Sequence, residues 1–252
     1  MLKIEHVSKV YDNGVRALTD INIEVPDGQF LVIIGLSGSG KSTLLRCINR
    51  LVEPTEGRIV WNGVDITAAT DEELRQIRRR IGMIFQQFNL VKRSKVITNV
   101  LAGRLGYTNP LWSVVNHFSS EDQQKALEKL ERVGIRDKAY VRASELSGGQ
   151  QQRVGIARAL MQEPELMLAD EPVASLDPAT SHSIMQYLEA LNKEDGITIL
   201  CSLHFLSLAR AYADRVIALK DGRLEFDGPP EEIDRQRFRE IYGEDAVEVE
   251  IH

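Results

Sequence analysis

The stretch GLSGSGKST, from Gly35 to Thr43, constrains this chain more than any other part of its sequence. It fits the pattern G-x-x-x-x-G-K-[ST], in which glycines let backbone N–H groups point at phosphate oxygens. The apolar run FLVIIGL before it is typical of a buried parallel strand, and KSTLLRCINRL after it has helical spacing. A strand, a glycine loop and a helix in this order predict a nucleotide phosphate site in an α/β domain.

The polar residues of this loop have distinct predicted roles. Lys41 is expected to reach the β- and γ-phosphates, and the hydroxyl of Ser42 is expected to bind Mg²⁺. The other residues predicted to bind the nucleotide are Gly35, Ser37, Gly38, Ser39, Gly40 and Thr43. The alternative is a chance glycine-rich turn, and the strand and helix that flank the loop argue against it.

A second apolar strand, LMLAD, ends in two neighbouring acids. Parallel strands of such a sheet end at the edge where nucleotides bind, so Asp170 is predicted to lie beside Mg²⁺. Glu171 follows it and is predicted to polarise the attacking water as a general base. A strand that ends in two solvated acids is the alternative interpretation.

The segments around these two motifs predict a mixed fold. Hairpins are expected around the turns Asn13-Gly14, Asn62-Gly63 and Asp221-Gly222. A third buried strand, ITILCS, is expected after a helix that Asp177-Pro178 begins. The sequence pattern between residues 88 and 163 predicts a mostly helical insertion into this fold.

Within that helical part, SSEDQQKALEKLERVG predicts one well-defined helix. A capping box is expected from Ser120 and Gln123, and the helix is expected to stop at Gly134. The aromatic residues Tyr107, Trp112 and Phe118 either fill the small core of this part or anchor a partner, and core filling is slightly favoured.

Composition excludes some classes of function. The 252 residues carry a formal net charge of -6, so bulk electrostatics do not favour nucleic acid. The arginine-rich run RQIRRRIG follows TDEEL, which is typical of a solvated helix that complements its own dipole. Cys47 and Cys201 are expected to be buried thiols. No apolar run approaches the roughly 18 residues of a membrane span, and no signal peptide is expected at the N-terminus.

The stretch ELSGGQQQRVGIARAL places a serine and two glycines before a helix, as in a phosphate-binding helix N-terminus. A second such loop is redundant in a chain that already has one. Taken together, the motifs resemble those of the ATP-binding subunit of an ABC transporter, whose signature is LSGGQ (residues 146–150). The resemblance runs nearly from end to end of the chain.

The resemblance implies roles for further residues. MIFQQF resembles the Q-loop, so Gln86 is expected at the γ-phosphate, at Mg²⁺ and near the membrane partner. CSLH resembles the switch region, which implies that His204 lies near the γ-phosphate. ASLD resembles the D-loop, with Asp177 as its acid, and Tyr11 falls where the family stacks an aromatic ring on adenine. The signature implies that Ser147, Gly148, Gly149 and Gln150 contact ATP held by a second copy of the chain.

Two departures from the usual family pattern refine the resemblance. Ala174 and Ser175 are exchanged relative to the usual D-loop order, and Leu203 rather than a hydroxyl residue precedes His204. In both departures, and in the insertion LAGRLGYTNPLWSVV, the sequence resembles the phosphonate-importer branch of the family.

The implied fold is an α/β P-loop NTPase of the ABC ATPase type: a mixed β core, an N-terminal antiparallel β subdomain and a helical insertion. The chain is expected to be one domain, residues 1–252. Residues 1–87 and 164–252 are expected to form its nucleotide-binding core and residues 88–163 its helical signature subdomain.

The implied activity is Mg²⁺-dependent ATP hydrolysis that drives an importer through closure of a homodimer. Expected partners are integral membrane permease subunits at the cytoplasmic side of the membrane and, indirectly, a solute-binding protein; no nucleic acid is expected. The alternatives are an importer of a polar amino acid or another small solute, a soluble ABC-type ATPase acting on DNA or ribosomes, and a different P-loop enzyme such as a small-molecule kinase.

Overall fold

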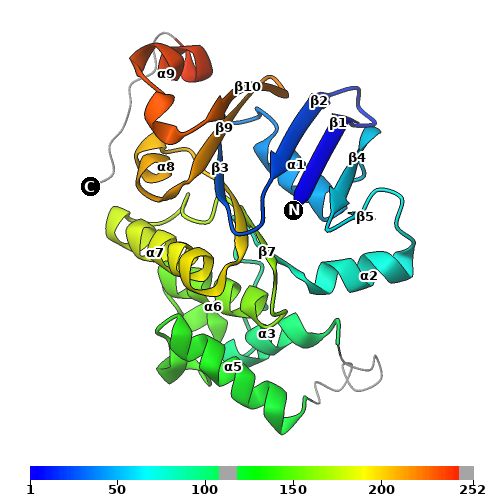
Figure 1. Cartoon of the computed structure of the whole chain (residues 1–252). Coiled ribbons are helices and arrows are strands. Elements are labelled where there is room, and N and C mark those ends of the chain that lie inside the picture. Colours follow the sequence, from blue (N-terminus) through cyan, green and yellow to red (C-terminus); the bar gives the residue numbers. More distant parts are fainter. Residues whose placement is uncertain (108–117, 244–252) are drawn as a thin grey trace.

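The computed structural model describes residues 1–107 and 118–243. Within these residues the strands form two sheets (Figure 1). The antiparallel sheet has the order β2-β1-β4-β5. Its strands are β1 (Leu2–Val10), β2 (Arg16–Val25), β4 (Glu56–Trp61) and β5 (Val64–Asp65). The predicted N-terminal antiparallel sheet is thereby confirmed.

The second sheet has the order β10-β9-β3-β8-β7-β6. Its strands are β3 (Phe30–Ile34), β6 (Ile81–Ile84), β7 (Leu166–Asp170), β8 (Thr198–Ser202), β9 (Arg215–Lys220) and β10 (Arg223–Gly228). Only the β9–β10 hairpin is antiparallel among the pairs of this sheet in the described residues. The strands β3, β7 and β8 are buried along their whole length, as their apolar sequences predict.

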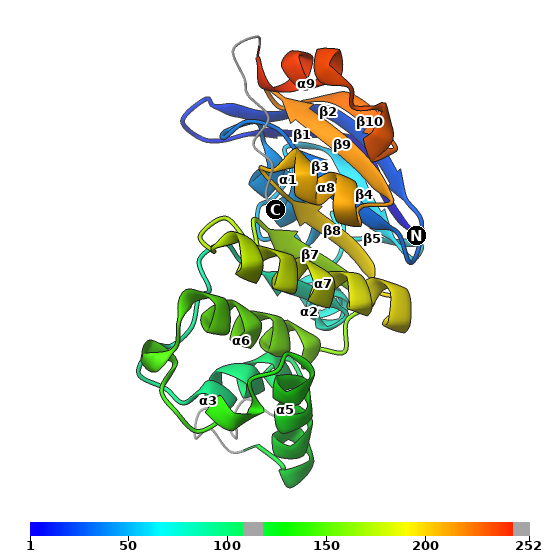
Figure 2. The same cartoon turned by 90° about the vertical axis from the view of Figure 1, so that its left-hand side faces the viewer.

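The longer helices complete the fold. They are α1 (Lys41–Ile48), α2 (Asp71–Arg79), α3 (Val96–Leu101), α5 (Ser120–Arg132), α6 (Gly148–Leu160), α7 (Pro178–Asp195), α8 (Leu206–Tyr212) and α9 (Arg235–Tyr242). Short 3₁₀ helices span Ala102–Arg104, Arg136–Lys138, Ala143–Glu145 and Pro230–Glu232. Helices α3, α5 and α6 pack together at one end of the molecule (Figure 2).

Two apolar clusters hold these parts together. One joins the face of the core sheet that carries Phe30 and Val32 to the helices α3, α5, α6 and α7. The other joins the opposite face, with Leu31 and Ile33, to α1, α2 and the antiparallel sheet. Alternate residues of β3 therefore serve both clusters, which fixes the strand that leads into the glycine loop. The division of the chain at residues 88 and 163 stays a prediction.

The predicted capping box of α5 is wrong by one residue. The N-cap is Ser119, whose side chain accepts a hydrogen bond from the backbone N–H of Asp122. Ser119 has the extended backbone that an N-cap needs, and Ser120 is already the first helical residue. Gln123 donates its side-chain N–H to the carbonyl of Phe118 instead. The predicted end of the helix is confirmed, since Gly134 has a φ of +71°.

The arginine-rich helix α2 is only partly solvated. Its capping box of Thr70 and Glu73 and its acidic first turn match the predicted complement to the helix dipole. Arg78, however, donates to the carbonyls of Asn49 and Arg50 just past the end of α1. The interpretation of the whole run as a solvated surface is therefore wrong at Arg78, because the end of α1 needs donors for its free carbonyls.

The aromatic residues of the insertion differ in environment. Phe118 is 6% exposed and belongs to the core cluster, which confirms core filling there. Tyr107 is 40% exposed, and the guanidinium groups of Arg79 and Arg104 both lie over its ring. Its hydroxyl donates to the carbonyl of Arg79 at 3.0 Å. Trp112 lies outside the described residues.

Both cysteines are buried free thiols, as predicted, and burial raises their pKa values.

The corrected cap of α5 can be tested by measuring stability. Ser119→Ala should lower the free energy of unfolding by about 1 kcal/mol, because the N–H of Asp122 loses its acceptor. Chemical denaturation of the isolated chain measures this. Ser120→Ala is the matched control and should change the free energy of unfolding by much less. An equal loss in the two variants would contradict the assignment of Ser119 as the cap.

Candidate active site

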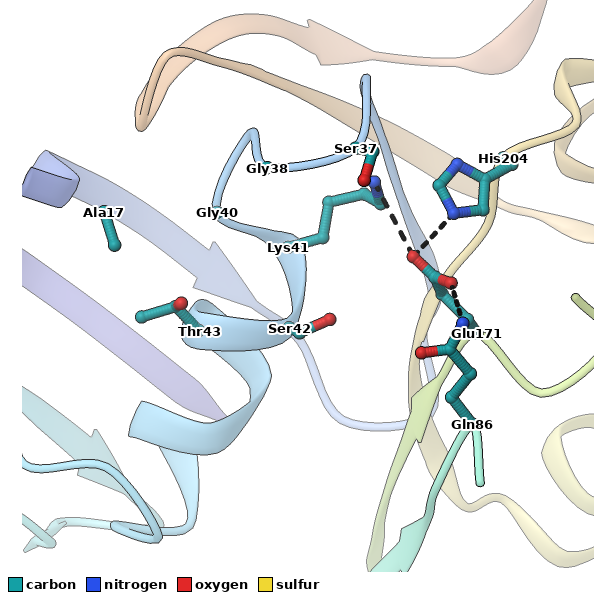
Figure 3. A pocket seen from close by; sticks show the side chains of 10 residues that line it. All are labelled: Ala17, Ser37, Gly38, Gly40, Lys41, Ser42, Thr43, Gln86, Glu171 and His204. Atoms are coloured by element: carbon teal, nitrogen blue, oxygen red, sulfur yellow. Dashed lines mark hydrogen bonds and ion pairs between the residues drawn. The ribbon is translucent and has the colours of Figure 1, made fainter. Parts of the chain in front are cut away.

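A cavity of about 370 Å³ lies at the carboxyl edge of the core sheet, over the glycine loop (Figure 3). Its walls come from β2, the loop and α1, and from the segments that follow β6, β7 and β8. The lining residues are Ala17, Ser37, Gly38, Gly40, Lys41, Ser42, Thr43, Gln86, Glu171 and His204. The structure thus brings together the predicted phosphate loop and the three residues predicted to act in catalysis.

Two glycines of the loop are required by close approach of the backbone. Gly35 has a φ of +141°, and a Cβ there would lie 2.2 Å from the carbonyl oxygen of Leu219. Gly40 has a φ of +107°, and a Cβ there would lie 2.5 Å from the carbonyl oxygen of Ala17. Gly40 is the N-cap of α1 without a side-chain cap. The first N–H groups of α1 are therefore available to an anion in the cavity.

Lys41 is fixed above the loop. Its side chain is 3% exposed, and Nζ donates to the carbonyls of Gly35 at 2.8 Å and of Leu36 at 3.0 Å. Burial lowers the pKa of Lys41, while the nearby carboxylates of Glu171 and Asp170 act in the opposite direction. A buried cation of this kind is stabilised further by a phosphate, which brings charge of the opposite sign into the cavity.

Asp170, at the end of β7, is 1% exposed and holds a network of polar groups. Its Oδ1 accepts from Ser42 Oγ at 2.6 Å and from Ser202 Oγ at 3.3 Å, and its Oδ2 accepts from Arg46 at 3.1 Å. The sequence did not single out Ser202 and Arg46. The position of Arg46, one helical turn after Ser42 on α1, was the available signal.

Glu171 meets three of the predicted residues in the cavity (Figure 3). Its Oε2 accepts from Gln86 Nε2 at 2.8 Å, its Oε1 lies 2.6 Å from His204 Nε2, and Lys41 Nζ lies 3.9 Å from Oε1. The φ of Glu171 is +48°, a left-handed conformation that is uncommon outside glycine. Its amide N–H donates to Ser202 Oγ, which holds this conformation. The carboxylate therefore faces the cavity from a fixed position.

The residues present fit a magnesium ion bound together with phosphates. Ser42 Oγ and the carboxylate of Asp170 are adjacent hard oxygen donors, and Gln86 lines the same cavity. The described residues contain no cluster of three or more His, Cys, Asp or Glu that would hold a metal alone. This donor set suits Mg²⁺, which keeps several waters and is bound through one or two carboxylates plus substrate phosphates.

Some predicted residues lie beside this cavity rather than in it. The hydroxyl of Tyr11 lies 3.2 Å from Thr43 Oγ1, and Lys9 lies over the Tyr11 ring. Ser39 is 5% exposed behind Gly35 and so backs the loop. These residues are placed next to the start of α1, and the adenine contact of Tyr11 stays a prediction.

The signature residues form a separate group in the same chain. Ser147 is the N-cap of α6 in a reciprocal capping box with Gln150. A Cβ on Gly149 would lie 2.5 Å from Thr180 Cγ2, so the signature packs directly against the first turn of α7. Asp177 caps that turn and accepts from the N–H of Thr180. Hydrogen bonding to the side chain of Thr180, and then to its backbone, lowers the pKa of Asp177. The signature and the predicted D-loop are thus brought together, and neither lines the cavity over the phosphate loop.

Comparisons with known proteins agree with this arrangement. The sequence profile described as ABC transporter matches residues 18–174, more than half of the chain. The chain belongs to the ABC transporter family. It is 57% identical over 250 residues to a phosphonates import ATP-binding protein of Bdellovibrio bacteriovorus, covering 99% of this chain and 96% of that relative. It is 55% identical to a protein of the same description from Shouchella clausii, covering 100% and 94%.

Solved structures of ABC transporter cassettes share the fold. A bacterial ABC transporter cassette solved as a dimer has a TM-score of 0.82 and 39% identity, covering 91% of this chain and 99% of that one. A second dimeric structure of the same cassette, in a post-hydrolysis state with ADP and Pi, has a TM-score of 0.80 and 39% identity, again covering 91% of this chain and 99% of that one. The predicted ABC ATPase fold and ATPase class of this chain are confirmed. The described residues contain no helix long and apolar enough to cross a membrane.

The position of Glu171 in this ABC ATPase predicts the effect of removing its charge. Glu171→Gln should bind ATP with nearly unchanged affinity, because the amide keeps the shape of the side chain. The rate of hydrolysis should fall roughly 10²–10⁴-fold, since a general base is lost. Phosphate release, with nucleotide binding measured in parallel, tests both parts. Hydrolysis at a near-normal rate would remove Glu171 from the catalytic role.

Proposed function

We propose that this chain is the ATPase subunit of a phosphonate importer and that it works as a homodimer bound to a membrane permease. The observation that carries the proposal is the separation of two ATP-binding groups within one chain. The phosphate loop, Glu171 and His204 share one cavity, whereas Ser147 and its helix N-terminus lie outside it. Each group is half of a site that a second copy completes.

The geometry supports a head-to-tail pair of chains. The N–H groups and the positive dipole end of α6, at Ser147, attract an anion. ATP on the loop of one chain presents that anion to the signature of its partner. Such a two-fold arrangement is isologous and closes on itself. The similar cassette was solved as a dimer in both structures, which supports the pairing of two chains.

The residues of the cavity have different roles in ATP hydrolysis. Backbone N–H groups of the loop and Lys41 bind and orient the phosphates. Ser42, Asp170 and Gln86 would hold Mg²⁺, which when bound neutralises charge on the phosphates. Glu171 accepts a proton from the attacking water, and His204 and Gln86 hold the carboxylate in place by the contacts that the structure shows. The loss of the γ-phosphate then removes the contact that joins the two chains.

The permease is proposed to dock near Gln86. A cleft of about 230 Å³ lies where the nucleotide core meets the helices, close to the start of the Q-loop. Its walls include the half-exposed Leu51 after α1, Met83 and Phe85 beside Gln86, and Gly103 from the helical part. A segment seated there touches both parts of the chain, so it would move when the dimer opens. We therefore propose that the chain lies at the cytoplasmic face of the membrane, with a solute-binding protein on the other side of the permease.

The transported solute is proposed from the relatives, whose printed description is phosphonate import. Reconstitution of the chain with its permease and binding protein in lipid nanodiscs tests this. A phosphonate such as methylphosphonate should stimulate ATP hydrolysis several-fold, and a polar amino acid should not. The complex carrying Glu171→Gln is the control for hydrolysis by other proteins. Stimulation by the amino acid alone would contradict the phosphonate assignment while leaving the importer intact.

A further inference from the structure

A second hollow, of about 790 Å³, lies on the helical part of the chain. One wall is the segment that leads into α3, with Arg93 and Lys95, and the other is the segment from Tyr140 to Glu145 that leads to the signature. We call this hollow the basic groove. None of its lining residues lines the active-site cavity or the cleft beside Gln86.

The two walls of the basic groove are tied together by backbone hydrogen bonds. Lys95 and Arg142 form an antiparallel bridge. The N–H of Val96 donates to the carbonyl of Val141 at 2.9 Å, and the N–H of Ala143 donates to the carbonyl of Ser94 at 3.0 Å. Val96 and Ala143 are themselves buried. The groove is therefore a fixed feature of the fold, and its cationic side chains project from a rigid base.

The charge of the groove contrasts with that of the chain. Arg93, Lys95 and Arg142 line it together with a single acid, Glu145, whereas the whole chain has a net charge of -6. Within residues 1–107 and 118–243, none of these three cations forms an ion pair with a carboxylate, although most other arginines of that part do or donate to backbone carbonyls. Unpaired like charges that are held close together repel one another and attract an acidic partner.

An aromatic side chain stands at the groove. Tyr140 is 64% exposed, compared with 40% for Tyr107. Lys95 Nζ lies 6.0 Å from the centre of the Tyr140 ring. An exposed tyrosine beside arginines is the composition that anchors protein interfaces. The volume is far larger than a single phosphate or phosphonate needs.

We propose that the basic groove binds an acidic segment on the cytoplasmic face of the permease, a contact separate from the cleft beside Gln86. This proposal rests on the proposed function. The walls of the groove continue into both halves of the ATP site: one wall follows Gln86 along the chain, and the other leads directly to Ser147. A permease segment that clamps the two walls would hold the signature in register with the Q-loop while the dimer closes.

Charge reversal tests the electrostatic part of the proposal. Arg142→Glu should weaken binding of the detergent-solubilised permease subunits roughly tenfold or more at low salt, and the difference should shrink as salt is raised. Arg75→Glu, an exposed arginine on α2, is the matched control and should bind as the wild type does. ATP hydrolysis by the isolated Arg142→Glu chain should stay close to that of the wild type, because Arg142 lines neither the cavity nor the cleft.

Cross-linking tests the identity of the occupant. A photoreactive benzoylphenylalanine in place of Tyr140 should cross-link, in the assembled complex, to a permease segment that contains Asp or Glu. Reversal of that acid to Lys should restore binding to the Arg142→Glu chain. Equal permease binding by wild type and Arg142→Glu, or cross-links only to segments without acids, would overturn the proposal.

Two further outcomes distinguish this proposal from a lipid-binding site and from failure of the proposed importer function. If Arg142→Glu instead abolishes binding to phosphatidylglycerol vesicles and leaves permease binding unchanged, the groove is a lipid site and the proposal is wrong. If the wild-type chain binds no permease subunits at all, the proposed importer function fails first. Binding by the wild type that is unaffected by Arg142→Glu rejects the groove alone.

Discussion

The buried carboxylate of Asp170 is the interaction on which the rest of the site depends. It accepts hydrogen bonds from Ser42 on α1, from Ser202 at the end of β8 and from Arg46, so it ties the phosphate loop to two strands of the core. An unpaired carboxylate at 1% exposure would be costly, and these donors remove that cost. Asp170 is the last residue of β7, so these contacts also hold the end of the strand from which Glu171 enters the cavity.

The proposed arrangement also accounts for two helix N-termini of the type that binds anions in a single chain. The N-terminus of α1 lines the cavity, whereas the N-terminus of α6 packs beside the first turn of α7 and lies outside the cavity. Within one chain these groups do not share a ligand. In the proposed homodimer, the nucleotide of each chain would be the contact that holds both together. Its hydrolysis would open the pair, and the cleft beside Gln86 and the basic groove would transmit this motion to the proposed permease.

Most of the fold and the centre of the site could be predicted from the sequence. The glycine loop, the acid-ended strand and the N-cap at Asp177 are local signals whose geometry follows from a few adjacent residues, and the structure has all three. The sequence missed Arg46 and Ser202, because their role depends on which strands are neighbours. It placed the cap of α5 at Ser120 rather than Ser119, since two adjacent serines offer the same hydroxyl and only the backbone decides. It also missed the hydrogen bonds of the half-buried Arg78, because the carbonyls that accept them follow the end of a helix distant in the sequence.

The central claim is that each ATP is shared between two chains. The most direct measurement is the mass in solution, by light scattering, of Glu171→Gln chains at saturating ATP. The account predicts a shift from 28.4 kDa to twice that mass when ATP is added. Adding Ser147→Arg should keep the chain monomeric while it still binds ATP, because the phosphate loop is intact and only the partner's contact is lost. Glu171→Gln chains that stay monomeric in ATP, or that dimerise equally well with Ser147→Arg, would contradict it.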